Sequence, residues 1–178
     1  ITGGFEALKS VGHDGDIDYA RSLLVERLAL AAELADSYRV RLAFEPLHPM
    51  VCGFRSIVST LQESLDILDQ MDDSHDIGLA IDTYALWWEH DLQEKLKRAG
   101  RRILNYHVSD WLADTRDLRL DRGMPGDGQI ALCDWRHMIE EAGYFGPIEV
   151  EIFSRDRWWK TPAEKMIEEI IQRMNSAF

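Results

Sequence analysis

Apolar positions along the chain follow two patterns, one typical of helices and one typical of buried strands. Between Asp18 and Tyr38, apolar side chains recur at steps of three and four residues, which places them on one face of an amphipathic helix. These positions are Leu24, Leu28, Ala31, Ala35 and Tyr38. The run VRLAFE (40–45) follows and indicates a buried strand.

Helical and strand-like segments alternate through the rest of the chain. Thr60 and Glu63 form a predicted capping box at the start of one helix, and Gly100 and Gly143 are predicted to end two later ones. The predicted segments are a helix at 60–68 before strand 77–82, a helix at 91–99 before strand 102–107, a helix at 132–142 before strand 147–153, and a final helix from 161.

Apolar strands separated by helices indicate βα units around a parallel sheet. The sequence therefore predicts an α/β protein, and residues 1–178 form a single predicted domain because no linker-like segment interrupts them. The irregular stretch 111–129 is too long for an ordinary connection and is predicted to be a functional loop.

Composition and charge exclude several classes of partner. The formal charge of -12 disfavours nucleic acid and anionic membranes, and no apolar run approaches the roughly 18 residues that span a bilayer. Cys52 and Cys133 lie too far apart to suggest a zinc motif or a disulfide framework. The N-terminus lacks the pattern of a signal peptide, so we expect a cytoplasmic protein.

An ionisable residue lies at or near the C-terminal end of each predicted strand. These residues are Glu45, Asp82, His107 and Glu151. Singly, each could be a helix cap or a structural histidine, but ligands of parallel α/β proteins bind at this edge of the sheet. Three carboxylates and an imidazole buried together need a compensating cation, and an oxygen-rich set with one nitrogen suits Mn, Mg, Co or Zn.

Five segments resemble, in order, the later strands of the xylose isomerase-like TIM barrels, the superfamily of sugar phosphate isomerases and epimerases that includes the ketose 3-epimerases. These segments are EPLHPM, DTYALWW, HVSDW, RGMPGDGQI and AGYFGPIEVEIFS. The resemblance implies a (β/α)8 barrel. This chain would hold its C-terminal half, about strands 5 to 8, and ITGG (1–4) would be the tail of another strand. Such barrels typically have about 250 residues, so we expect either a fragment, which we favour, or completion by another copy or chain.

The resemblance also implies the roles of individual residues. Glu45, Asp82, His107 and Glu151 would hold one divalent metal ion, and Glu45 and Glu151 would double as acid and base. Arg122 matches the arginine that contacts substrate in this family, with a surface salt bridge as the alternative.

Three further positions bear on the substrate. His48 could face the site or anchor its own loop, and Trp111 could stack on a sugar ring or pack ordinarily. Ala85 stands where family members commonly have a histidine that contacts substrate.

The predicted function is a metal-dependent sugar isomerase or epimerase with a small sugar or sugar-derived substrate. The base would remove a proton next to a carbonyl, and the metal would stabilise the enediolate. One alternative is a lyase acting on an oxidised sugar or glycoside, and another is a noncatalytic sugar-binding protein. An apurinic endonuclease is disfavoured by Ala85 and by the negative charge. The sequence does not decide whether the protein forms a homo-oligomer.

Overall fold

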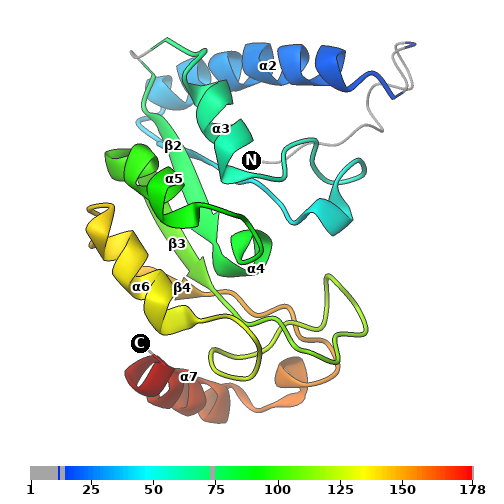
Figure 1. Ribbon diagram of the computed structural model, residues 1–178, viewed down its shortest axis with the longest axis vertical. Coiled ribbons are helices and arrows are strands. Elements are labelled where there is room, and N and C mark those ends of the chain that lie inside the picture. The colour runs from blue at the N-terminus through cyan, green and yellow to red at the C-terminus, as the bar shows by residue number, and fades with distance from the viewer. Residues whose placement is uncertain (1–11, 13–14, 73–74, 178) are drawn as a thin grey trace.

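Four parallel strands form the sheet of the computed structural model, which describes residues 12, 15–72 and 75–177. The strands are β1 (Leu42–Phe44), β2 (Ile77–Asp82), β3 (Ile103–Val108) and β4 (Ile148–Val150). Each strand pairs with the next one along the chain, so their carboxyl ends point the same way (Figure 1). This arrangement confirms the predicted parallel α/β sheet.

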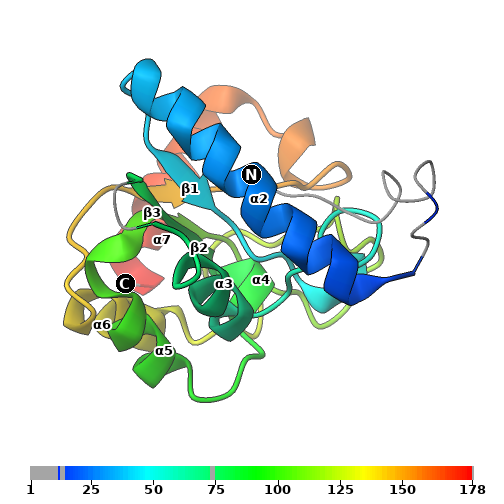
Figure 2. The same ribbon diagram turned by 90° about the horizontal axis from the view of Figure 1, so that it is seen from above.

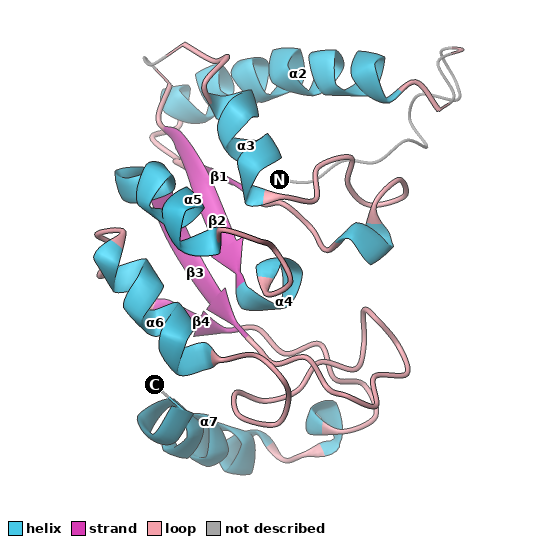
Figure 3. Cartoon of the chain, viewed as in Figure 1, coloured by secondary structure: helices cyan, strands magenta, loops and turns pink. Residues whose placement is uncertain are grey.

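Helices connect successive strands and cover one face of the sheet. The connecting helices are α3 (Leu61–Leu68), α4 (Thr83–Leu86), α5 (Leu92–Ala99) and α6 (Leu132–Glu141). Figure 3 shows α3, α5 and α6 packed in a row along the sheet, and α5 contacts both of the others. Two longer helices, α2 (Ile17–Ser37) and α7 (Ala163–Ala177), lie at the two ends of this row (Figures 1 and 2). Within the described ranges, no helix is both long and apolar enough to cross a bilayer.

The core lies between the sheet and this row of helices. Leu65 of α3, Leu96 of α5 and Ile139 of α6 are almost completely buried against strand residues such as Leu79 and Tyr106. The buried residues of α5 and α6 recur at steps of three and four, so each helix packs one face on the sheet.

Helix α2 departs from the predicted apolar face at its C-terminal end. Leu28 and Ala35 are buried as predicted, but Tyr38 is 73% exposed and its prediction as a packed residue is wrong. The helix ends at Ser37, so Tyr38 lies at the C-cap, outside the last helical turn.

The predicted helix boundaries hold to within a residue or two. Thr60 is the N-cap of α3, and its hydroxyl oxygen accepts a hydrogen bond from the Glu63 N–H at 3.0 Å. Gly100 and Gly143 both have positive φ values, 52° and 91°, which glycine adopts readily at the end of a helix.

The two outer strands are shorter than predicted. Strand β1 covers 42–44 rather than 40–45, and β4 covers 148–150 rather than 147–153. Each has only one neighbouring strand among the described residues, which limits the hydrogen-bonded ladder. Glu45 and Glu151 therefore lie one residue beyond their strands. The stretch ITGG (1–4) lies outside the described residues.

Candidate metal centre

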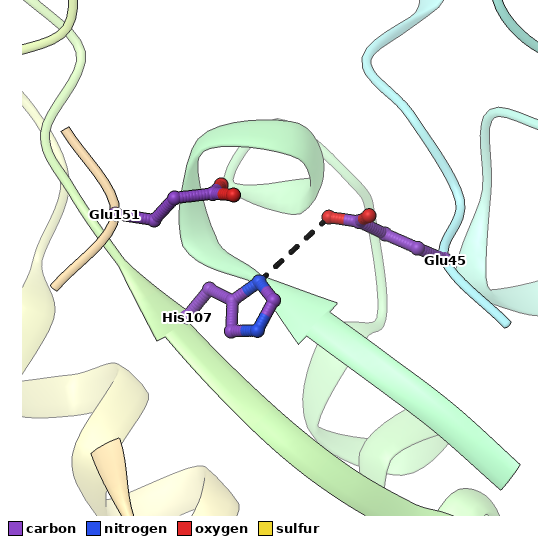
Figure 4. A group of neighbouring side chains, drawn as sticks. All are labelled: Glu45, His107 and Glu151. Atoms are coloured by element: carbon purple, nitrogen blue, oxygen red, sulfur yellow. Dashed lines mark ion pairs between the residues drawn. The ribbon is translucent and has the colours of Figure 1, made fainter. Parts of the chain in front are cut away.

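The carboxyl ends of β1, β3 and β4 bring three potential metal ligands together. Glu45 follows β1 directly, His107 is the fifth residue of β3, and Glu151 follows β4 directly. One ligand atom from each of these residues lies within 4.8 Å of the other two. Figure 4 shows the two carboxylates approaching the His107 ring from different sides.

His107 presents a free nitrogen to this group. Its Nδ1 atom is buried, has no hydrogen-bond partner among the described residues, and lies 3.9 Å from Glu45 Oε1. Its other nitrogen, Nε2, lies 4.0 Å from Glu149 Oε2. A buried nitrogen without a partner is costly unless a ligand satisfies it, so the donor set fits a divalent cation.

Asp82 lies beside this group, and both of its carboxylate oxygens already accept hydrogen bonds from the protein. Its side chain has no exposed surface, Oδ1 accepts a hydrogen bond from Tyr84 N–H, and Oδ2 accepts one from Arg122 Nη1, each at 2.9 Å. The three residues whose ligand atoms lie within 4.8 Å of one another do not include Asp82. Its role as a fourth ligand stays a prediction.

Arg122 connects Asp82 to Glu151. Its Nη1 lies 2.9 Å from Asp82 Oδ2 and 2.9 Å from Glu151 Oε2, and the guanidinium lies over the rings of Tyr84 and Phe153. Burial by itself lowers the pKa of Arg122, but the two carboxylates outweigh it and raise the pKa. With only 13% of its side chain exposed, Arg122 is not a surface salt bridge.

The surroundings of Glu45 disfavour its charged form. Burial, followed by repulsion from Asp82 and Glu151, raises the pKa of Glu45 to about 7, although His107 and Arg122 oppose this rise. A carboxyl group with a pKa near neutrality can both accept and return a proton at physiological pH. A bound cation would favour its charged form.

The loop that carries Arg122 is folded around the buried carboxylate of Asp110. This carboxylate accepts hydrogen bonds from four backbone N–H groups, those of Trp111, Gly126, Gly128 and Ile130. A Cβ atom at Gly128 would lie 2.2 Å from the Trp111 carbonyl oxygen, so only glycine fits there. The RGMPGDGQI segment is therefore more than a plain turn, because its glycines let the backbone wrap Asp110.

Asp110 and Glu149 were not singled out from the sequence as site residues. Asp110 follows β3 within HVSDW, but nothing in the sequence shows that a distant loop folds back onto it. Glu149 lies two residues before Glu151 and points to the same side of β4, so alternation alone could have placed it near His107.

His48 and Trp111 belong to an aromatic cluster beside the candidate metal centre. The Trp111 ring stacks on His48 and on Tyr84, with centroid separations of 4.7 Å in both cases. His48 Nδ1 accepts a hydrogen bond from Met50 N–H, which anchors its loop, and burial lowers the pKa of His48. His48 also lines a hollow next to Arg122 together with Ala85, whereas Trp111 is not among the residues that line it.

Comparison with known proteins identifies the family of this chain. The sequence matches the family described as xylose isomerase-like TIM barrel over residues 4–177. Inosose isomerase from Bacillus subtilis strain 168 is 28% identical over 152 residues, which are 81% of this chain and 51% of that enzyme. The chain thus spans about half the length of the curated relatives that it matches.

Solved structures share the fold. A crystal structure from Sinorhizobium meliloti 1021 superposes with a TM-score of 0.88 and 44% identity, over 93% of this chain and 60% of that one. The IOLI protein, crystallised with a zinc atom, superposes with a TM-score of 0.77 and 24% identity, over 90% of this chain and 57% of that one. The resemblance seen in the sequence is confirmed, and this chain belongs to the xylose isomerase-like TIM barrel family.

Proposed function

We propose that this chain carries the metal centre and the acid–base residues of a divalent-metal-dependent sugar isomerase or epimerase. The convergence of Glu45, His107 and Glu151, with ligand atoms within 4.8 Å of one another, carries the proposal. The similarity to inosose isomerases supports the reaction class, and the zinc atom bound by the structurally similar IOLI protein supports a divalent metal.

Glu45, His107 and Glu151 would hold the cation, with Asp82 as the adjacent fourth candidate. Carboxylate oxygens and an imidazole nitrogen suit Mn, Mg, Co or Zn better than a thiolate-seeking ion. When bound, such a cation supplies a Lewis acid that stabilises negative charge on a substrate oxygen.

The two glutamates are placed to move protons at a substrate carbon. They come from β1 and β4, at opposite edges of the described sheet, and face a common space above His107 (Figure 4). One carboxylate would remove the proton next to a carbonyl, and the other would return it. Return to the opposite face of the same carbon gives epimerisation, and return to the neighbouring carbon gives isomerisation.

Arg122 and Asp82 prepare one of these glutamates for its role. The ion pair at 2.9 Å holds the Glu151 carboxylate in a fixed position. Asp82, itself fixed by the Tyr84 N–H, holds the arginine from the other side. The side chains of Glu151, Arg122 and Asp82 therefore form a chain of contacts, anchored at the Tyr84 backbone N–H, that orients the base before substrate arrives.

Proton exchange between substrate and solvent tests this proposal directly. The metal-loaded protein is incubated in D₂O with an inosose and with a set of ketohexoses, and deuterium incorporation is followed by NMR. We expect exchange in the parent and a loss of about 100-fold in Glu151→Gln that still binds metal, because the base is gone. Glu94→Gln, an exposed substitution on α5, serves as the matched control.

Two outcomes would contradict an isomerase or epimerase. Sugar binding without any exchange in the metal-loaded parent would indicate a noncatalytic sugar-binding protein. Release of an eliminated group in place of a rearranged sugar would indicate a lyase.

A further inference from the structure

A small hollow next to the metal centre is lined by three arginines. Arg55, Arg119 and Arg122 contribute to its wall, and its volume is about 60 Å³. Arg122 also contacts Glu151 and Asp82, so the hollow opens beside the proposed acid–base residues. A space of this size accepts one small group of a substrate and not a whole sugar ring.

Two of the three arginines form no ion pair among the described residues. Arg122 is paired with carboxylates, but neither Arg55 nor Arg119 forms an ion pair there. The two acids nearest to Arg119 along the chain form ion pairs with other arginines, Asp117 with Arg155 and Asp121 with Arg157.

The other polar side chains of the wall already have hydrogen-bond partners. The Tyr84 hydroxyl donates to the Leu118 carbonyl at 3.1 Å, and His48 Nδ1 accepts from Met50 N–H. Arg55 and Arg119 add guanidinium groups, which can only donate hydrogen bonds. Such donors match the acceptor oxygens of a carboxylate or a phosphate.

Most arginines at the opposite end of the sheet are ion-paired. A larger hollow of about 640 Å³ there is lined by Arg41, Arg98 and Arg102, which are each ion-paired with an aspartate, and by Arg101, which forms no ion pair among the described residues. In a chain of formal charge -12, three arginines around one small hollow, two of them without an ion pair, concentrate positive charge locally. Such a concentration attracts an anion that the overall charge would repel.

We propose that the substrate of this site is a sugar derivative with an anionic group, and that Arg55 and Arg119 bind this group. The inference rests on the proposed sugar isomerase or epimerase function and narrows its substrate class. A carboxylate and a phosphate share the chemistry that the two guanidinium groups recognise, and both can form paired hydrogen bonds with arginine.

Binding of three matched ketohexose probes tests the inference. Fructose, fructuronate and fructose 6-phosphate share a skeleton but differ in carrying no anion, a carboxylate or a phosphate. Each is titrated by NMR into the metal-free full chain, so that an anion bound to metal does not contribute. We expect at least one anionic probe to bind about tenfold more tightly than fructose, and the better of the two identifies the group.

Substitutions assign this preference to the two arginines. The Arg55→Gln/Arg119→Gln double variant should bind the anionic probe no better than fructose, with folding checked by circular dichroism. Arg55→Lys should keep part of the preference because it keeps the charge. Arg116→Gln, at an exposed arginine of the same loop that does not line the hollow, should keep all of it.

The outcomes separate this inference from the proposed function. Equal binding of all three probes to the parent, or a preference that survives in the double variant, would overturn the inference. Turnover of neutral sugars only would overturn it while leaving the isomerase or epimerase function intact. An arginine-dependent preference in a protein without proton exchange would support the anion site and contradict the function.

Discussion

At the scale of single residues, Arg122 controls the charge balance of the site. Asp82 has no exposed side-chain surface and depends on Arg122 for its only ion pair among the described residues. We expect Arg122→Ala to lower the free energy of unfolding by about 3 to 5 kcal/mol, because it leaves a buried carboxylate without its cation. Urea denaturation of the metal-free protein measures this loss.

A surface arginine provides the control for Arg122. Arg155 is 52% exposed and pairs with Asp117 and Asp156, so Arg155→Ala should cost less than about 1 kcal/mol. Adding Asp82→Asn to Arg122→Ala should recover part of the loss. Equal effects of the two single arginine substitutions would show that the Asp82 pair is not the source of the stability.

The protonation of Glu45 gives metal binding a defined pH dependence. The pKa of Glu45 is raised to about 7, chiefly by burial, so the metal-free site holds a proton there below neutrality. A cation must displace that proton, and affinity therefore rises with pH until Glu45 is charged. We expect Mn²⁺ to bind about tenfold more tightly at pH 8 than at pH 6, measured by calorimetric titration. The same affinity at both pH values would contradict the assignment of Glu45 as a ligand.

The candidate ligands could be predicted from the sequence because parallel strands end at one edge of the sheet. Glu45, His107 and Glu151 were placed by this rule alone, without knowledge of their side-chain directions. The contacts of Asp82 with Arg122 and Tyr84, and the stacking of Trp111 on His48, could not be predicted, because they depend on how the loop at 111–129 folds.

At the scale of elements, this loop packs so closely at Gly128 that a side chain has no room there. The Cβ of Gly128→Ala would lie 2.2 Å from the Trp111 carbonyl oxygen and 2.6 Å from Asp110 Oδ1. The backbone would have to move, which would weaken the hydrogen bonds to Asp110 and displace Arg122. We expect a loss of stability of roughly 2 kcal/mol or more, measured by thermal unfolding.

Gly143→Ala separates this steric effect from backbone strain. Gly143 has a φ of 91°, but no atom lies within 4 Å of the position that a Cβ would occupy. Its substitution should cost only about 1 kcal/mol, the usual penalty for a side chain at positive φ. If Gly128→Ala is no more destabilising than Gly143→Ala, the close packing at Gly128 is not important for stability.

Helices could be predicted more accurately than strands. A capping box such as that of Thr60 and Glu63 marks a helix end through local contacts, which the sequence contains. The extent of β1 and β4 depends instead on which strands lie beside them, and that is a property of the assembled sheet. This dependence explains why both outer strands proved shorter than their apolar runs.

At the scale of the whole molecule, the site spans the complete described sheet. Glu45 follows the first strand in the order and Glu151 follows the last, with His107 between them on β3. No single βα unit contains the centre, so the centre depends on the sheet as a whole. The assignment of the chain to the C-terminal half of a barrel, and its oligomeric state, stay predictions.

Metal binding by the purified full chain tests the central claim most directly. The metal-free protein is titrated with Mn²⁺ and Zn²⁺, and the bound metal per chain is measured for the parent, for His107→Ala and for the exposed control His137→Ala. We predict one ion per chain in the parent and the control, and an affinity at least about 100-fold weaker in His107→Ala, because a ligand is lost. A parent that binds no metal, or a His107→Ala variant that binds it as tightly as the parent, would contradict the proposed metal centre.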